Sequence, residues 1–118
     1  MSKILWLAEP EEHNYPAAES FLSLLFPAPQ VKKIIANLRT AKPVTFKAKD
    51  VFRASGLSLL GVSNSHVEKD RDKVKSGKAL SPILLVRDAG RVVIADGYHR
   101  MCAVYMEDED AEIPCRIV

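Results

Sequence analysis

The sequence is poor in the residues and segments that mark several specialised protein classes. It has two cysteines, Cys102 and Cys115, which are too few for a disulfide framework and too far apart for a zinc knuckle. Five glycines in 118 residues exclude a collagen-like chain. No apolar run approaches the roughly 20 residues that cross a bilayer, and the stretch at residues 4–8 is too short for the core of a signal peptide. We therefore expect a cytoplasmic protein without membrane contact, whose cysteines are reduced and partly buried.

The sequence also lacks a dominant sign of charge. Seventeen basic and fifteen acidic side chains leave a net charge of +2. Proteins that hold nucleic acid by neutralising phosphates usually carry a larger or more clustered basic excess. The balance argues against DNA binding, although the basic residues between positions 69 and 78 leave a contact with a nucleic-acid backbone open.

What is present is the composition of a globular domain. Hydrophobic residues make up 47% of the chain and charged residues 27%, and 118 residues is the length of one domain. Apolar spacing, prolines and capping residues predict helices over residues 14–26, 31–39, 47–54, 66–76 and 98–106. Apolar runs between turn residues predict strands over 57–62, 82–87, 91–95 and 113–118. Pro114 points to an edge or a strand start for the last of these. A hairpin that feeds a helix, among mixed elements, favours an α+β fold.

One segment, Asp96–Arg100, has the composition of an anion site at the predicted junction of a strand and a helix. The first N–H groups of a helix have no partner within the helix, and the helix dipole places partial positive charge there. Gly97 allows a tight turn and a close approach of a ligand. His99 and Arg100 add donors, and basic side chains at a helix N-terminus are unfavourable unless an anion neutralises them. The segment therefore predicts a bound phosphate.

The same residues also fit a purely structural role. Asp96 could cap the helix, Arg100 could pair with the acidic residues 107–110, and His99 could be an ordinary surface histidine. The sequence leaves both interpretations open.

The segments Leu80–Val86 and Ile94–Arg100 resemble the ParB/sulfiredoxin superfamily. Its members place a charged helix before an apolar strand of this type, then a hairpin, and then a glycine-containing loop with histidine or arginine that opens a helix. The resemblance covers roughly residues 62–104 and extends loosely to residue 118. It implies a small mixed sheet with flanking helices, a loop that binds nucleotide phosphates, and one domain over residues 1–118 with an N-terminal helical extension at about 1–55.

The loop distinguishes between branches of this superfamily. Sulfiredoxins carry a catalytic cysteine immediately before the histidine-arginine pair, where this chain has Tyr98, so the resemblance does not imply sulfiredoxin activity. ParB partition proteins have a glycine-glutamate-arginine-arginine loop and further domains, which argues against chromosome partitioning. The free-serine kinases have an aspartate-glycine-histidine-histidine-arginine loop. Asp96, Gly97, His99 and Arg100 match that loop, and Tyr98 departs from it.

The kinase branch implies a catalytic carboxylate as well. Its members place one just after a histidine, ahead of the apolar strand, and use it as general base, which makes Glu68 the corresponding candidate. Phosphoryl transfer needs such a base, donors for the phosphates and usually Mg²⁺. Glu68 could instead pair with Arg71 on the same helix face. His66, Glu68 and Asp70 point in different directions on a helix, so we expect no metal site from them.

Three functions therefore follow as hypotheses. The first is a nucleotide-binding domain, acting as a Mg²⁺-dependent phosphotransferase or nucleotide hydrolase, with ATP or another nucleotide held by Asp96, Gly97, Tyr98, His99 and Arg100. The second is a non-catalytic module for nucleotide sensing or protein interaction. The third is a ParB-like nuclease.

Overall fold

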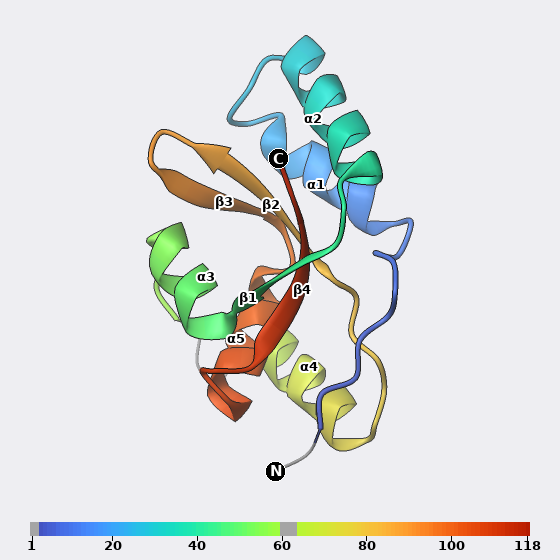
Figure 1. The fold of residues 1–118 in the computed structure, drawn as a ribbon, viewed down its shortest axis with the longest axis vertical. Helices are drawn as coiled ribbons and strands as arrows, with labels where there is room; N and C mark the ends of the chain where they lie inside the picture. Colours follow the sequence, from blue (N-terminus) through green and yellow to red (C-terminus); the bar gives the residue numbers. More distant parts are fainter. Residues whose placement is uncertain (1–2, 60–63) are drawn as a thin grey trace.

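The computed structural model describes residues 3–59 and 64–118 (Figure 1). The helices in this part of the chain are α1 (Asn14–Leu22), α2 (Ala28–Thr40), α3 (Ala48–Ser55), α4 (Ser65–Lys75) and α5 (Tyr98–Glu107). The strands are β1 (Val44–Lys47), β2 (Ile83–Asp88), β3 (Arg91–Asp96) and β4 (Glu112–Ile117). The fold is α+β, as the order of elements in the sequence predicts.

The four strands form one mixed sheet in the order β1-β4-β2-β3. The predicted hairpin is confirmed, because β2 and β3 pair antiparallel with Val86 opposite Val93. After β3, the chain passes through α5 and returns as β4, which lies parallel to β2 with Leu84 opposite Arg116. β1 then covers the other side of β4 in antiparallel register.

Helices pack on both faces of the sheet (Figure 1). Successive side chains of a strand point to opposite faces, and β2 shows this directly. Ile83 and Leu85 belong to the apolar cluster that also holds residues of α3, α4 and α5. Leu84 and Val86 belong to the cluster beneath α1 and α2. Burial on both faces explains why the first four residues of β2, Ile83–Val86, are all apolar, whereas Arg87 and Asp88 at its end are exposed.

Pro114 predicts either a sheet edge or a strand start for the last strand, and the edge alternative is wrong. β4 lies between β1 and β2, and Pro114 is opposite Thr45 of β1. The ladder between β4 and β2 covers Cys115–Ile117, so Pro114 lies outside it and its missing N–H removes no bond to β2. The two edge strands are instead β3 and β1, and the sequence did not predict β1.

Two further boundaries differ from the prediction. α1 ends at Leu22, and a turn over residues 23–26 replaces its expected last turn. This turn brings Phe26 against the cluster beneath α1 and α2, while Leu24 remains 82% exposed. Pro27 favours this break, because the residue before a proline is biased away from helical backbone angles. Of the strand predicted at 57–62, residues 57–59 are not in a strand, and the remainder lies outside the described residues.

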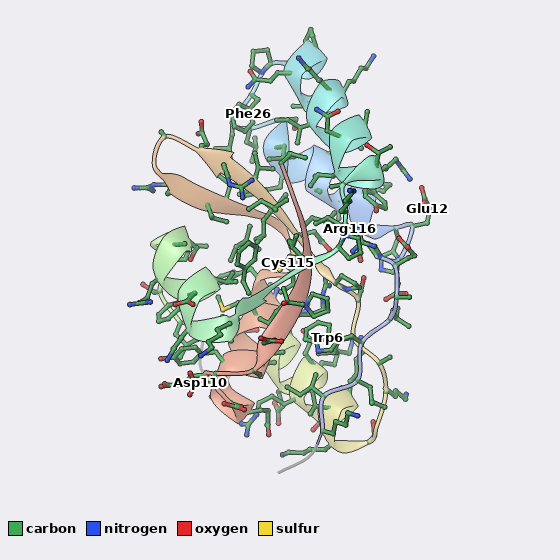
Figure 2. All side chains as sticks on the ribbon, viewed as in Figure 1. Trp6, Glu12, Phe26, Asp110, Cys115 and Arg116 are labelled. Atoms are coloured by element: carbon green, nitrogen blue, oxygen red, sulfur yellow. The ribbon has the colours of Figure 1, made fainter. Side chains whose placement is uncertain are left out.

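The N-terminal segment runs beside the loop that precedes β2. Leu7 N donates to the carbonyl of Leu80, and Leu80 N donates to the carbonyl of Leu5, each at 2.8 Å. Trp6, labelled in Figure 2, forms a parallel bridge with Leu80. Arg116, also labelled there, donates from Nη2 to the carbonyl of Ala8 at 3.3 Å. The two cysteines are buried and neither forms a disulfide. In the described ranges, none of the helices has the length and apolar character needed to cross a bilayer.

Candidate functional site

The turn between β3 and α5 requires glycine at position 97. Gly97 has φ +110° and is the N-cap residue of α5. A Cβ atom there would lie 2.8 Å from Cγ1 of Ile83, a fully buried residue of the neighbouring strand. Positive φ and close packing against β2 therefore both exclude a larger side chain. The first turn of α5 is held at a fixed position over the sheet.

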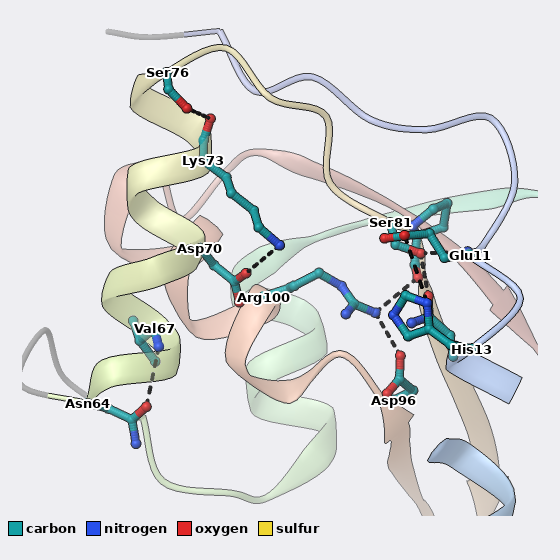
Figure 3. Close-up of polar contacts among 12 residues, drawn as sticks. Glu11, His13, Asn64, Val67, Asp70, Lys73, Ser76, Ser81, Asp96 and Arg100 are labelled. Carbon is teal, nitrogen blue, oxygen red and sulfur yellow. Dashed lines mark hydrogen bonds and ion pairs between the residues drawn. The ribbon is translucent and has the colours of Figure 1, made fainter. Parts of the chain in front are cut away.

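Arg100 folds back from α5 onto this turn (Figure 3). Its Nη2 donates to Oδ2 of Asp96 at 2.9 Å and to the carbonyl of Pro82 at 3.3 Å. The side chains of Arg100 and Asp96 are 16% and 17% exposed, so this is a largely buried ion pair. Nε of Arg100 is buried without a hydrogen-bond partner in the described structure.

This pairing differs from the structural alternatives stated for Asp96 and for Arg100. Asp96 does not cap α5, because Gly97 is the N-cap and no side chain caps that helix. Arg100 does not reach the acidic residues 107–110. Glu107 instead accepts from Arg71 at 2.8 Å, and Asp110 pairs with Lys49 at 2.7 Å.

Helix α4 brings polar side chains to the same turn. Asn64 caps α4 by accepting from the N–H groups of His66 and Val67, and Val67 and Val74 are buried against the core, as their seven-residue spacing predicts. The imidazole rings of His66 and His99 lie 4.8 Å apart between centroids. The two helices enclose a polar pocket of about 240 Å³, which we call the α4–α5 pocket. It is lined by His66, Lys69, Asp70, Lys73 and Asp96–Arg100.

Asp70 is the buried carboxylate of this pocket. Its Oδ1 lies 3.8 Å from Nζ of Lys73 (Figure 3). Burial raises the pKa of Asp70, while the charges of Lys73, Arg100, His99 and His66 act in the opposite direction. The pKa of His99 is lowered, chiefly by burial and then by the neighbouring His66. The pocket thus holds two carboxylates, Asp70 and the Asp96 that pairs with Arg100, among several cationic or protonatable groups.

Glu68, the sequence candidate for a general base, lies elsewhere. It is exposed and does not line the α4–α5 pocket. Its expected partner Arg71 pairs with Glu107 of α5. The sequence did hold the signal for Asp70, because this residue is three positions after Val67 and four before Val74, on the helix stripe that faces the core.

The site residues expected from the loop are otherwise brought together. Asp96, Gly97, Tyr98, His99 and Arg100 all line the α4–α5 pocket. Sequence reasoning missed the contribution of α4 to this pocket, which depends on how α4 packs against α5.

The pocket does not fit a resident Mg²⁺ ion. Mg²⁺ prefers oxygen ligands, usually one or two carboxylates together with substrate phosphates. Here the carboxylate of Asp96 is paired with Arg100, and that of Asp70 lies beside Lys73. Among residues 3–59 and 64–118, no three histidine, cysteine or acidic side chains are grouped so as to hold a metal ion. The charge of the pocket favours an anion.

Comparisons of the chain with protein-family models, with curated proteins and with solved structures found no match. The functional argument therefore depends on the residues of the pocket.

Proposed function

We propose that this chain binds nucleotides and holds a phosphate group in the α4–α5 pocket. The observation that carries this proposal is the convergence of cationic groups from two separate elements. α4 contributes His66, Lys69 and Lys73, while α5 contributes His99 and the N–H groups of its first turn. Helix N-termini and basic side chains together form favourable phosphate sites.

The ion pairs determine which cations are available to a ligand. Arg100 is neutralised by Asp96, and Lys73 is partly neutralised by Asp70. Lys69 has no ion-pair partner within the described residues, and its side chain is exposed at the pocket. We therefore assign the direct phosphate contacts to Lys69, Lys73 and the two histidines. Arg100 is assigned a positioning role, because it fixes the turn.

The proposal includes a ParB/sulfiredoxin-like fold. The order of elements supports it: a charged helix, α4, precedes an apolar strand, β2, and a hairpin leads through the glycine turn into α5. The loop Asp96–Arg100 supports the free-serine kinase branch through four of its five residues.

A phosphotransferase or nucleotide hydrolase is the second candidate, and Asp70 favours it. A buried carboxylate with a raised pKa inside a pocket is a typical general base. In that reaction, Asp70 would accept the proton of the attacking hydroxyl or water. The oxygen would then bond to the terminal phosphorus, the bond from that phosphorus to the bridging oxygen would break, and the nucleoside diphosphate would leave. Glu68 is exposed outside the pocket, so its removal should leave such a reaction intact.

Titration calorimetry with ATP tests the binding proposal. The double variant Lys69→Ala/Lys73→Ala should weaken binding by about tenfold or more, the effect of losing charged hydrogen bonds at a partly exposed site. The double variant Lys75→Ala/Lys78→Ala is the matched control, because it also removes two exposed lysines, and both lie outside the pocket. Equal losses in both variants would indicate only a general charge effect, and no ATP binding by the wild type would overturn the proposal.

Turnover distinguishes the enzyme from the other classes. Release of inorganic phosphate from ATP, abolished by Asp70→Asn and retained by Glu68→Gln, would support an enzyme with Asp70 as base. Binding without turnover would identify a sensing module. Degradation of DNA in place of ATP turnover would indicate the nuclease.

A further inference from the structure

A second pocket adjoins the α4–α5 pocket across the β3–α5 turn. It has a volume of about 450 Å³, within the range typical of small-molecule sites, and we call it the apolar pocket. Its own residues come from three separate parts of the chain: Ala17 and Phe21 of α1, Leu57 after α3, and Ile94 and Ala95 of β3. The residues Asp96–His99 line both pockets.

The residues Asp96–His99, which line both pockets, determine the path by which one ligand could occupy both. A phosphate at Lys69 and Lys73 lies on one side of the turn, so a group attached to that phosphate can extend over Tyr98 and His99 to the other side. The rings of Tyr98 and His99 lie 5.7 Å apart between centroids and form part of this wall. One ligand with an anionic end and an apolar end therefore matches the two pockets together.

The surface of the apolar pocket is suited to a flat ring. Phe21 is 43% exposed and Leu57 is 45% exposed, so each presents a large apolar surface that the protein itself does not cover. Aromatic side chains gain energy from stacked or edge-on contact with other rings. A nucleobase offers such a ring at a short distance from its phosphate.

Two polar side chains in the wall of this pocket, those of Asp96 and Tyr98, already have hydrogen-bond partners within the protein. Asp96 accepts from Arg100, and the hydroxyl of Tyr98 donates to the carbonyl of Ser58. The ring of His99 lies against His66. A site distinguishes one base from another through donors and acceptors that are free to hydrogen-bond with the edge of the base. A wrong base leaves these groups of the protein unpaired, and that cost gives strong discrimination. The side chains that line only this pocket offer apolar contact in place of such readout: Ala17, Phe21, Leu57, Ile94 and Ala95.

We propose that the apolar pocket binds the base of the nucleotide by ring contact with Phe21, so that the site accepts phosphate esters of flat aromatic groups with little selectivity among bases. This inference rests on the proposed function and adds its substrate class. It also gives the N-terminal helical extension a role, because Phe21 belongs to α1, outside the region that resembles the ParB/sulfiredoxin superfamily. Phe21 acts as a determinant of ligand class.

A series of ligands tests the inference on the wild-type chain. The probes are AMP, GMP, CMP, ribose 5-phosphate and inorganic phosphate, each measured by titration calorimetry. We expect the three mononucleotides to bind within about tenfold of one another and at least about fivefold more tightly than ribose 5-phosphate. A larger spread among the mononucleotides would overturn the weak base selectivity, and a smaller gain over ribose 5-phosphate would overturn the ring site.

Variants of the apolar pocket test whether Phe21 causes the tighter binding of AMP relative to ribose 5-phosphate. Phe21→Ser should lower AMP affinity to that of ribose 5-phosphate while leaving ribose 5-phosphate affinity unchanged. Leu24→Ser is the matched control, since Leu24 follows the same helix, is 82% exposed and lies outside both pockets. Leu57→Ser provides a second variant from another segment if Phe21→Ser fails to unfold cooperatively. Unchanged AMP affinity in the folded variant would overturn the role of this surface.

The two proposals fail in different ways in this experiment. If ribose 5-phosphate and inorganic phosphate bind through Lys69 and Lys73 but AMP gains nothing, only the ring site is wrong. If none of the probes binds, the proposed function is wrong and the inference fails with it.

Discussion

The substitution Gly97→Ala tests whether the β3–α5 turn is held by steric contact with the sheet. Gly97 has φ +110°, and an added Cβ would lie 2.8 Å from Cγ1 and 3.2 Å from Cγ2 of Ile83. The same atom would lie 3.0 Å from Nη2 of Arg100, which is the flexible end of a side chain and can move. Ile83 is fully buried within β2 and has little freedom to withdraw. The substitution therefore creates backbone strain and overpacking together.

The two contributions have separate magnitudes. Left-handed backbone costs an alanine about 1–2 kcal/mol. Forcing extra carbon into a packed core costs about 1–3 kcal/mol. We therefore expect Gly97→Ala to lower the free energy of unfolding by about 2–5 kcal/mol, which is a large fraction of the stability of a domain of this size.

Gly90→Ala is the matched control for the backbone contribution. Gly90 has φ +79°, and a Cβ added there would meet no atom within 4 Å. It should lose about 1–2 kcal/mol, from backbone strain alone. Urea unfolding followed by circular dichroism measures both variants, and an unchanged slope with denaturant would show that the difference is one of stability.

A double-mutant cycle isolates the contact with Ile83. Ile83→Ala alone should cost about 2–5 kcal/mol through the cavity it leaves. Combined with Gly97→Ala, the total should fall short of additivity by about 1–3 kcal/mol, because the truncation removes both atoms that the new Cβ would strike. Strict additivity, with Gly97→Ala no worse than Gly90→Ala, would refute the steric argument.

Other variants and conditions test the remaining parts of the structure. Arg100→Ala should cost about 2–3 kcal/mol in urea unfolding, because it leaves the largely buried Asp96 carboxylate without its partner, whereas Arg53→Ala, at an exposed ion pair, should cost under about 0.5 kcal/mol. The lowered pKa of His99 means that the unfolded chain takes up a proton at higher pH than the folded chain does. The free energy of unfolding should therefore decrease as the pH falls below about 6.5 and stop decreasing below the folded pKa, and unfolding curves of His99→Gln should show less of this decrease. Burial raises the pKa of Cys115 to about 12, so an aromatic disulfide reagent at about pH 8 should not modify this thiol before the chain unfolds. Cys115→Ser is the reference, and rapid modification that is present in the folded wild type but absent from this variant would contradict the burial of Cys115.

Local sequence patterns were sufficient to predict the helices and strands whose apolar spacing, caps or turns lie within the element itself. α2 has buried residues at helical spacing, and the structure extends it only slightly beyond the predicted 31–39. α4 begins where Asn64 can cap it and has the predicted pair of buried valines. The hairpin of β2 and β3 has two apolar runs separated by a turn at Asp88–Gly90. In each case, the determining interactions lie within a few residues of one another.

Elements that depend on distant partners were not predictable in this way. β1 has only four residues and alternates between half-buried and exposed positions, so it has too little apolar sequence to indicate a strand. Its hydrogen-bonding partner β4 lies some 65 residues later in the chain, where Lys47 pairs with Glu112. The internal position of β4 depends on the same pairing, and this explains why Pro114 was misleading about the sheet edge.

The candidate site likewise has residues that local sequence identifies and a residue that only the packing of distant elements brings to it. The loop Asp96–Arg100 was found from its sequence, because its glycine, its charges and the strand before it are contiguous. Asp70 could have been found from its place on the buried stripe of α4. Phe21 could not, since its position at the pocket depends on how α1 packs against β3.

The ion pair between Asp96 and Arg100 changes which charges a ligand would meet. From the sequence alone, every basic residue near the start of α5 is a potential phosphate ligand. In the structure, Arg100 uses its Nη2 on Asp96 and on the carbonyl of Pro82, so much of its charge and its donor capacity is used within the protein. The free positive charge at the pocket comes instead from Lys69 of α4, a residue outside the loop motif. If the pocket holds phosphate, the lysines of α4 must therefore contribute more of the affinity than Arg100, which fixes the geometry of the turn, and substitutions of these residues should separate the two effects.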